Sequence, residues 1–205
     1  MDKNRIISTY DSISDAYDKA FSLPSEHIDE FLKSMKPKSR ILDLGCGAGN
    51  NSVYLSNLGH DVIGVDLSDK MLALAKSKKS AAKFIKQDIG NVDFPDNSFD
   101  HIIAAYSLCY LPKADVLACL RKLHAILKKN GLIFIKLQEG ASAEISRPEP
   151  FNPELTLDLN VMSQTEINKL LKDSNFSVLK TYSDEKEPDG DLADLNELCI
   201  IAQAV

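Results

Sequence analysis

The sequence has no apolar run near the length that spans a membrane, which is about 18 residues. Its first residues, MDKNRIISTYDS, also lack the apolar core of a secretory signal peptide. We therefore expect neither a membrane partner nor export, and we predict a cytoplasmic protein.

Metal-ligand patterns and cationic patches are equally scarce. The four cysteines, Cys46, Cys109, Cys119 and Cys199, show no C-x-x-C pairing and no spacing typical of metal ligands. We expect them to be reduced and mostly buried, and we expect no metal site. The net charge is −6, and no stripe of Lys and Arg is present that would displace the counterions of a nucleic acid. Nucleic acid is therefore not an expected partner.

Size and apolar pattern predict one α/β domain over residues 1–205. The chain has 205 residues, of which 44% are hydrophobic, and this is enough for one sizeable core. Strands are expected at about residues 40–44, 61–65, 83–86, 101–105, 132–136, 177–182 and 197–204. Helices are expected between them, including one over 3–21 and a long one over 113–129.

The stretch 40–66, RILDLGCGAGNNSVYLSNLGHDVIGVD, combines a strand, a glycine-rich turn, a helix and a second strand. Gly45, Gly47 and Gly49 stand on alternate residues of the turn, where the missing Cβ atoms let a ligand approach the backbone. Asp66 ends the second strand 21 positions after Gly45, about the separation at which an acidic residue reaches the hydroxyls of a ribose. The stretch therefore predicts a nucleoside-binding unit.

The glycine spacing separates two ligand classes. A dinucleotide fingerprint, G-x-G-x-x-G, needs a third glycine at the position of Asn50. Here the turn reads G-x-G-x-G behind Asp43, which suits a ligand without phosphates. DLGCGAGN followed by VIGVDLSDKML resembles the first two motifs of the class I S-adenosylmethionine-dependent methyltransferases of small-molecule type. FPDNSFD, at residues 94–100, resembles the approach to the fourth strand in the same family.

The resemblance implies S-adenosylmethionine as the cofactor. Asp43 and the turn would orient its methionine end, Asp66 would accept from the ribose, and Asp88 would accept from the adenine amino group. The implied cofactor-binding residues are Tyr10, Tyr17, Asp43, Gly45, Gly47, Gly49, Asp66, Leu67, Met71, Asp88, Ile89 and Tyr106. Two alternatives stay open: Asp88 could simply cap a loop, and the tyrosines at 10 and 17 could be packing residues of an amphipathic helix.

No residue stands out as a general base. Tyr17 and Tyr110 are candidate catalytic residues by position only, as are Tyr10, His101 and Glu139. Methyl transfer from a sulfonium needs alignment of donor and acceptor above all, so a site without a base is chemically sufficient for some acceptors.

The order of elements also resembles the family. It implies a Rossmann-like, mostly parallel sheet of seven strands with helices on both faces and an antiparallel last strand. Residues 1–36 would form a helical lid over the cofactor, and residues 138–162 a substrate-shaping insertion. Three prolines there, Pro148, Pro150 and Pro153, forbid a regular helix, and a solvated loop is the simplest expectation. The acidic run 184–194 is expected to be a solvated hairpin loop.

The function implied is methyl transfer to a small-molecule acceptor by in-line displacement. An alternative of another class is a protein that binds S-adenosylmethionine without catalysis, for instance a regulatory partner. A nicotinamide-dependent oxidoreductase is a weaker alternative, because of Asn50. The sequence predicts neither the acceptor nor the oligomeric state.

Overall fold

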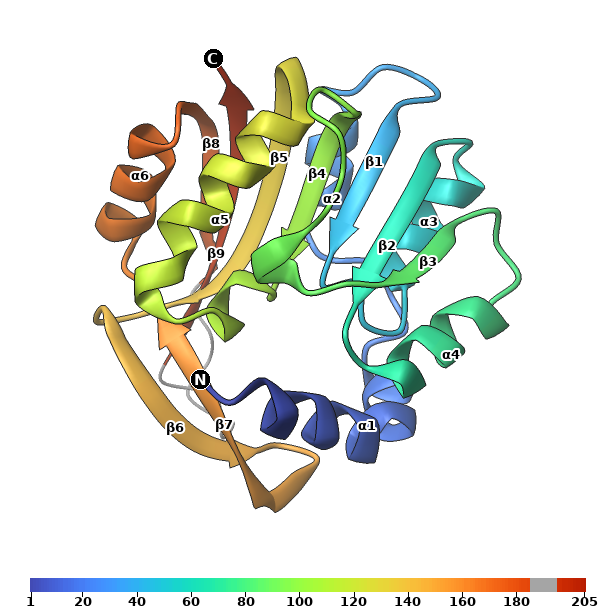
Figure 1. The fold of residues 1–205 in the computed structure, drawn as a ribbon, viewed down its shortest axis with the longest axis vertical. Coiled ribbons are helices and arrows are strands. Elements are labelled where there is room, and N and C mark those ends of the chain that lie inside the picture. The colour runs from blue at the N-terminus through green and yellow to red at the C-terminus, as the bar shows by residue number, and fades with distance from the viewer. Residues whose placement is uncertain (185–194) are drawn as a thin grey trace.

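The computed structural model describes residues 1–184 and 195–205. Its main sheet has seven strands in the order β3-β2-β1-β4-β5-β9-β8 (Figure 1). The strands are β1 (Arg40–Leu44), β2 (Asp61–Asp66), β3 (Lys83–Lys86), β4 (Phe99–Ala105), β5 (Leu127–Glu139), β8 (Phe176–Asp184) and β9 (Asn196–Ala204). The first five pair in parallel, whereas β9 runs antiparallel to both β5 and β8. The predicted fold, a Rossmann-like sheet with its last strand antiparallel, is confirmed.

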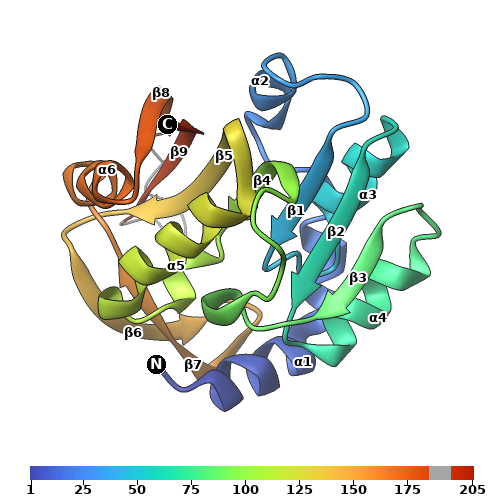
Figure 2. The ribbon, with the colours of Figure 1, turned by 45° about the horizontal axis from the view of Figure 1, so that its top comes forward.

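Helices cover both faces of this sheet (Figure 2). The helical elements are α1 (Lys3–Ala20), α2 (Ile28–Leu32), α3 (Asn50–Asn57), α4 (Asp69–Ser77), η1 (Ile89–Asn91), η2 (Leu108–Tyr110), α5 (Lys113–Ile126) and α6 (Gln164–Asp173). Buried residues of α5 and α6 share one core cluster, and those of α2 and α3 share another with the opposite face of the strands. Within residues 1–184 and 195–205, no helix is both long enough and apolar enough to cross a membrane.

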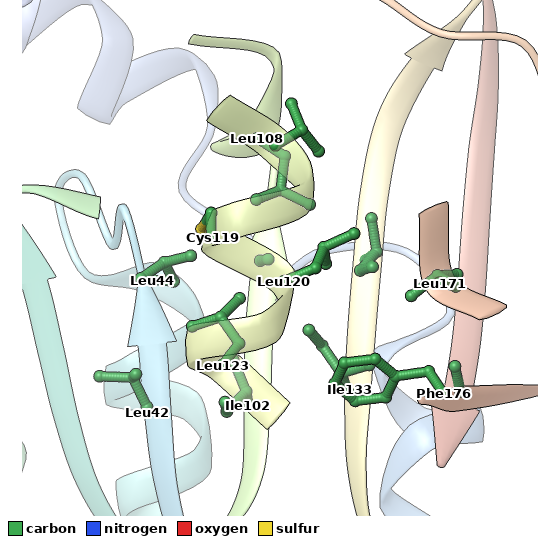
Figure 3. Packing of buried hydrophobic residues seen from close by; sticks show 14 of the residues in the cluster. Leu42, Leu44, Ile102, Leu108, Cys119, Leu120, Leu123, Ile133, Leu171 and Phe176 are labelled. Atoms are coloured by element: carbon green, nitrogen blue, oxygen red, sulfur yellow. The ribbon is translucent and has the colours of Figure 1, made fainter. Parts of the chain in front are cut away.

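Helix α5 is fixed to the central strands by leucines one turn apart. Leu120 and Leu123 are fully buried in a cluster with Leu42 of β1 and Ile102 of β4 (Figure 3). Each such leucine contributes roughly 1.5–3 kcal/mol through burial. This packing holds rigid the strands whose carboxyl ends build the site described below.

Two expected helical regions contain less helix than predicted. The helix expected over 113–129 ends at Ile126, because Leu127 already pairs with Phe99 of β4. Asn130 adopts a φ of 62° inside β5, so the strand is irregular at this residue. In the helical lid expected over residues 1–36, helix α2 contains only five residues.

The expectation of a solvated loop over 138–162 is wrong. β6 (Ala143–Glu149) and β7 (Asn152–Val161) form a separate two-stranded antiparallel sheet, called the ribbon below. Leu157, Leu159 and Val161 alternate along β7 and are buried, the last two in a cluster with Cys109. This period of two residues is the strand signal that the prolines obscured. The expected acidic loop beyond Asp184 lies outside the described residues.

Candidate active site

The site lies at the carboxyl ends of β1, β2 and β4, where open α/β sheets place their ligands. Helix α1 lies below the arrowheads of β1 and β2, and the ribbon lies beside α1, below α5 and α6 (Figure 1). A cavity of about 110 Å³ lies between α1 and the strand ends. Its lining includes these predicted residues: Tyr10, Tyr17, Gly45, Gly47, Asp66, Leu67, Met71, Asp88, Ile89 and Tyr106. Two predicted residues, Asp43 and Gly49, are not part of this lining.

The glycine turn has no room for side chains at its start. Gly45 has a φ of 69°, and a Cβ there would lie 2.6 Å from the Cβ of Ser107. Gly47 has a φ of 51°, and a Cβ there would lie 4.0 Å from Cε1 of the Tyr17 ring. Gly49 is different, because a Cβ there would meet Ala75 and Phe84 at 2.8 and 2.9 Å. Gly45 and Gly47 both line the cavity, and the contact with Ser107 leaves no room for a Cβ at Gly45, whereas Gly49 permits close packing of α3.

Asp66 holds the turn and the start of α4 together. Its two carboxylate oxygens accept hydrogen bonds from the backbone N–H groups of Gly47 and Ser68, each at 2.9 Å. Burial raises the pKa of Asp66, although these backbone bonds oppose the shift. Each carboxylate oxygen has a second lone pair, so Asp66 keeps capacity to accept from ligand hydroxyls.

Asp43 lies under the turn and is 1% exposed. The Ser52 hydroxyl donates to its carboxylate at 2.6 Å, which is the partner that a buried carboxylate requires. Burial raises the pKa of Asp43 to about 6, with a smaller contribution from Asp66. Asp43 lines a second, larger cavity described below, and not the first.

Asp88 faces the first cavity from the start of η1. Its carboxylate accepts from the N–H of Gly90 at 2.9 Å and forms an ion pair with Lys3 of α1. The loop cap foreseen as an alternative is therefore present, together with exposure to the cavity. Leu67 and the buried Met71 supply apolar lining beside it.

Three tyrosines form a connected group over the turn. The hydroxyls of Tyr10 and Tyr110 are hydrogen-bonded, and the Tyr10 ring meets the rings of Tyr17 and Tyr110 edge to face at 5.7 and 5.6 Å. Burial raises the pKa of all three, that of Tyr17 to about 12. These phenols therefore stay protonated at neutral pH, which makes Tyr17 and Tyr110 poor general bases.

Helix α1 is anchored on both sides of the cavity. Asp11 accepts from the Ser68 hydroxyl, and Asp18 pairs with Lys78, so both connect α1 to the region of α4. On the other side Arg5 forms an ion pair with Asp158 of the ribbon. The N-terminal helix thus bridges two elements that are far apart in the sequence.

A second cavity, of about 740 Å³, adjoins the first. It extends between the ribbon, residues 20–26 and the ends of β5 and β9. Residues that line both cavities are Tyr10, Tyr17, Gly45, Gly47, Ala105, Tyr106 and Tyr110. The two spaces therefore meet at the glycine turn and the end of β4.

The sequence did not point to the polar cluster in the second cavity. Lys136, only 4% exposed, forms ion pairs with Glu197 at 2.7 Å and Glu26 at 2.9 Å. Burial lowers the pKa of Lys136, but the two carboxylates outweigh this effect and raise it. Burial raises the pKa of Tyr106, and the nearby carboxylate of Glu197 raises it further. The available sequence signal for this cluster was a charged residue in an otherwise apolar run, namely Lys136 in LIFIKL and Glu197 in ELCIIA.

The remaining chemistry-bearing residues have structural roles. His101 is buried on β4, where its Nδ1 accepts from the N–H of Leu132, and burial lowers its pKa to about 4. The four cysteines are free and buried, as expected. Within the described part of the chain, no three His, Cys, Asp or Glu side chains gather in a way that would hold a metal ion.

Residues 41–131 match the family model of a methyltransferase domain. Over this segment the chain is similar to methyltransferase domains. The match covers the glycine turn, Asp66, Asp88 and Tyr106, which are the residues gathered at the first cavity. The expected enzyme class and the expected cofactor, S-adenosylmethionine, are confirmed at the level of this domain family.

Relatives of the methyltransferase domain agree with the match. The chain is 34% identical over 131 residues to the YqeM protein of Bacillus subtilis, covering 60% of this chain and 53% of YqeM. It is 32% identical over 144 residues to the demethylmenaquinone methyltransferase of Staphylococcus saprophyticus, covering 64% of this chain and 61% of that enzyme. The chain thus spans between about half and three-fifths of the length of these relatives.

The fold has close counterparts among solved structures. A SAM-dependent methyltransferase of Methanosarcina mazei aligns with a TM-score of 0.76 at 19% identity, covering 89% of this chain and 99% of that one. At this identity the likeness establishes the fold of the methyltransferase domain and leaves its acceptor open.

Proposed function

We propose that this protein transfers a methyl group from S-adenosylmethionine to a small-molecule acceptor. The observation that carries the proposal is the pair of adjoining cavities. One gathers ten of the residues predicted to bind the cofactor, and the other offers separate space for an acceptor. A relative whose name specifies demethylmenaquinone supports a small-molecule acceptor.

The residues around the first cavity suit the proposed cofactor. Asp66 offers a buried carboxylate for ribose hydroxyls, and Gly45 and Gly47 line the same cavity. Asp88 and the buried Met71 combine a hydrogen-bond acceptor with an apolar surface, as an adenine ring requires. Asp43 offers a carboxylate to the methionine end from the side of the second cavity.

S-adenosylmethionine supplies an activated methyl group, because its sulfonium leaves as a neutral thioether. The protein then has to align two molecules and exclude water. Gly45, Ala105 and Tyr106 stand where the two cavities meet, so they border the path between donor and acceptor. The tyrosine group and α1 cover this junction. In the proposal, residues 1–36 act as a lid and residues 138–162 shape the acceptor space.

The two alternatives are less well supported. A binding protein without catalysis has no need of a second cavity, of about 740 Å³, beside the first. An oxidoreductase would use a glycine at position 50, where Asn50 instead contacts the Phe21 carbonyl and Lys78 with its side chain. Asn50 therefore fastens neighbouring segments and does not open the turn to a pyrophosphate.

The test is a transfer assay with methyl-labelled S-adenosylmethionine and a panel of small phenols, amines, thiols and acids. We expect label in at least one acceptor and none with the Asp66→Ala variant. Tight binding of S-adenosylhomocysteine without transfer to any acceptor would contradict the proposal and favour the regulatory alternative.

A further inference from the structure

A buried hydroxyl at the first cavity, that of Ser107, has no hydrogen-bond partner among the described residues. We infer that the Ser107 hydroxyl is a further cofactor-binding group, and that it forms a hydrogen bond with the nucleoside half of S-adenosylmethionine. The inference deepens the proposed function and rests on it, because it assigns the first cavity to this cofactor.

The Ser107 side chain is buried but unpaired. Ser107 is only 3% exposed, and its Oγ makes no hydrogen bond within the described part of the chain. A hydroxyl can donate one hydrogen bond and accept two, and a buried hydroxyl that makes none weakens the fold. Ser107 also lines the first cavity. A ligand bound in that cavity is therefore the partner that this hydroxyl lacks.

Helix capping, the usual role of a serine at such a position, does not use this hydroxyl. Ser107 precedes η2, as Ser68 precedes α4 and Ser163 precedes α6. The hydroxyls of Ser68 and Ser163 accept from the N–H groups of Met71 and Glu166 at 3.0 and 3.3 Å. Ser107 has a ψ of −40°, whereas the other two serines have extended values of 120° and 155°, and its side chain forms no capping bond. Its hydroxyl is thus left for another partner.

The backbone around Ser107 fixes the position of the hydroxyl. Tyr106 has a φ of 53°, a left-handed value that clusters at functional sites, and its N–H donates to the Lys136 carbonyl at 2.7 Å. The extended chain of β4 therefore ends in a turn at Tyr106. Beyond it, a Cβ added at Gly45 would lie 2.6 Å from the Ser107 Cβ and 3.6 Å from its Oγ. A hydroxyl fixed in this way binds a ligand with little loss of conformational entropy.

The neighbours of Ser107 assign it to the nucleoside half of the ligand. A Cβ at Gly45 would also lie 3.7 Å from Cγ2 of Ile89, which is a predicted adenine-binding residue. Among the described lining residues, Ser107 and Asp88 belong to the first cavity only, whereas Asp43 belongs to the second only. Asp43 is the residue proposed to meet the methionine end. Ribose and adenine both offer donors and acceptors, so either can pair with the hydroxyl.

Two ligands test the assignment. S-adenosylhomocysteine contains both halves, whereas methylthioadenosine contains the nucleoside and the sulfur but lacks the amino-acid end. Both are titrated calorimetrically into the full chain and into Ser107→Ala, which keeps the Cβ beside Gly45 and removes only the hydroxyl. We expect Ser107→Ala to weaken both ligands by the same factor, about three- to tenfold, which is the loss typical of one hydrogen bond.

Ser56→Ala is the matched control. Ser56 of α3 is 8% exposed, its Oγ also lacks a partner within the described residues, and it lines neither cavity. This control should leave both affinities within about 1.5-fold of the parent.

Unfolding of the ligand-free variants gives a second measurement. The denaturant midpoint of Ser107→Ala should equal or exceed that of the parent, as in Ser56→Ala, because an unpaired buried hydroxyl adds no stability. A serine with a purely structural role would instead lower this midpoint when it is replaced.

The outcomes separate the inference from the proposed function. A parent chain that does not bind S-adenosylhomocysteine would refute the proposed function, and the inference with it. If the parent binds, an unchanged affinity in Ser107→Ala, or a lower midpoint of its ligand-free form, would overturn the inference alone. A loss confined to S-adenosylhomocysteine would do the same, because it would place the hydroxyl at the methionine end.

Discussion

Replacing Asp66 by Ala removes the carboxylate that connects the glycine turn to α4. In the free protein this carboxylate accepts two backbone hydrogen bonds at 2.9 Å, from Gly47 and Ser68. Hydrogen bonds to a charged group are worth about 1.5–3 kcal/mol each. Part of that loss is offset, because burial makes the charged form of Asp66 costly and raises its pKa. We therefore expect a modest loss of stability and a folded variant.

The effect on cofactor affinity should be larger. A bound ribose would lose a charged acceptor for its hydroxyls, and the turn would lose its fixed position. The affinity for S-adenosylhomocysteine should fall by about 2–4 kcal/mol, which corresponds to roughly 30- to 1000-fold in Kd. Asp66→Asn, which keeps one acceptor oxygen, should lose less than Asp66→Ala.

Calorimetric titration with S-adenosylhomocysteine measures the difference directly. Asp69→Ala is the matched control, because Asp69 follows Asp66 by only three residues and begins α4. Its side chain is 73% exposed and pairs with Lys86 of β3. We expect the control to stay within about twofold of the parent. A folded Asp66→Ala variant with unchanged affinity, or an equal loss in the control, would refute the placement of the ribose.

Three further predictions follow from the same geometry. The pKa of Asp43 is raised to about 6, so its stabilising contribution is complete below pH 4 and is lost as the pH rises through 6. Asp43→Asn should therefore remove about 3 kcal/mol of the change in unfolding free energy between pH 4 and 7, measured by denaturant unfolding. An unchanged pH profile in this variant would contradict the prediction. Gly45→Ala should weaken S-adenosylhomocysteine at least about tenfold, because its Cβ would meet Ser107 at 2.6 Å, whereas Gly59→Ala has the same sign of φ but open space and should not. Deleting residues 1–20 should keep the circular dichroism signal of the sheet and lower the affinity for S-adenosylhomocysteine at least about tenfold, because α1 lines the first cavity. Full affinity in the truncated chain would mean that α1 only packs against the domain and does not help to bind the ligand.

Local signals in the sequence were sufficient for the sheet and for most of the first cavity. Gly45 and Asp66 belong to one strand-turn-helix-strand unit, so their spacing along the chain already fixes their distance in space. Asp88 and Tyr106 follow strands three and four at the same edge of the sheet. Parallel pairing brings all four residues together without further information.

What the sequence could not provide depends on long-range pairing. Lys136 and Glu197 meet because β5 and β9 pair antiparallel, with Lys136 opposite Cys199. The ribbon was missed because its prolines outweighed the alternation of Leu157 and Leu159 along β7. Gly49 belongs to the motif, yet the structure assigns it to packing against α4 and β3, and spacing alone does not separate these roles.

The central claim is that the glycine turn and Asp66 bind a sulfur nucleoside and not a dinucleotide. Parallel calorimetric titration of the full chain with S-adenosylmethionine, S-adenosylhomocysteine and NADH tests it most directly. The account predicts saturable binding of the first two ligands at one site and no detectable binding of NADH. Binding of NADH, or absence of binding for both sulfur ligands, would contradict it.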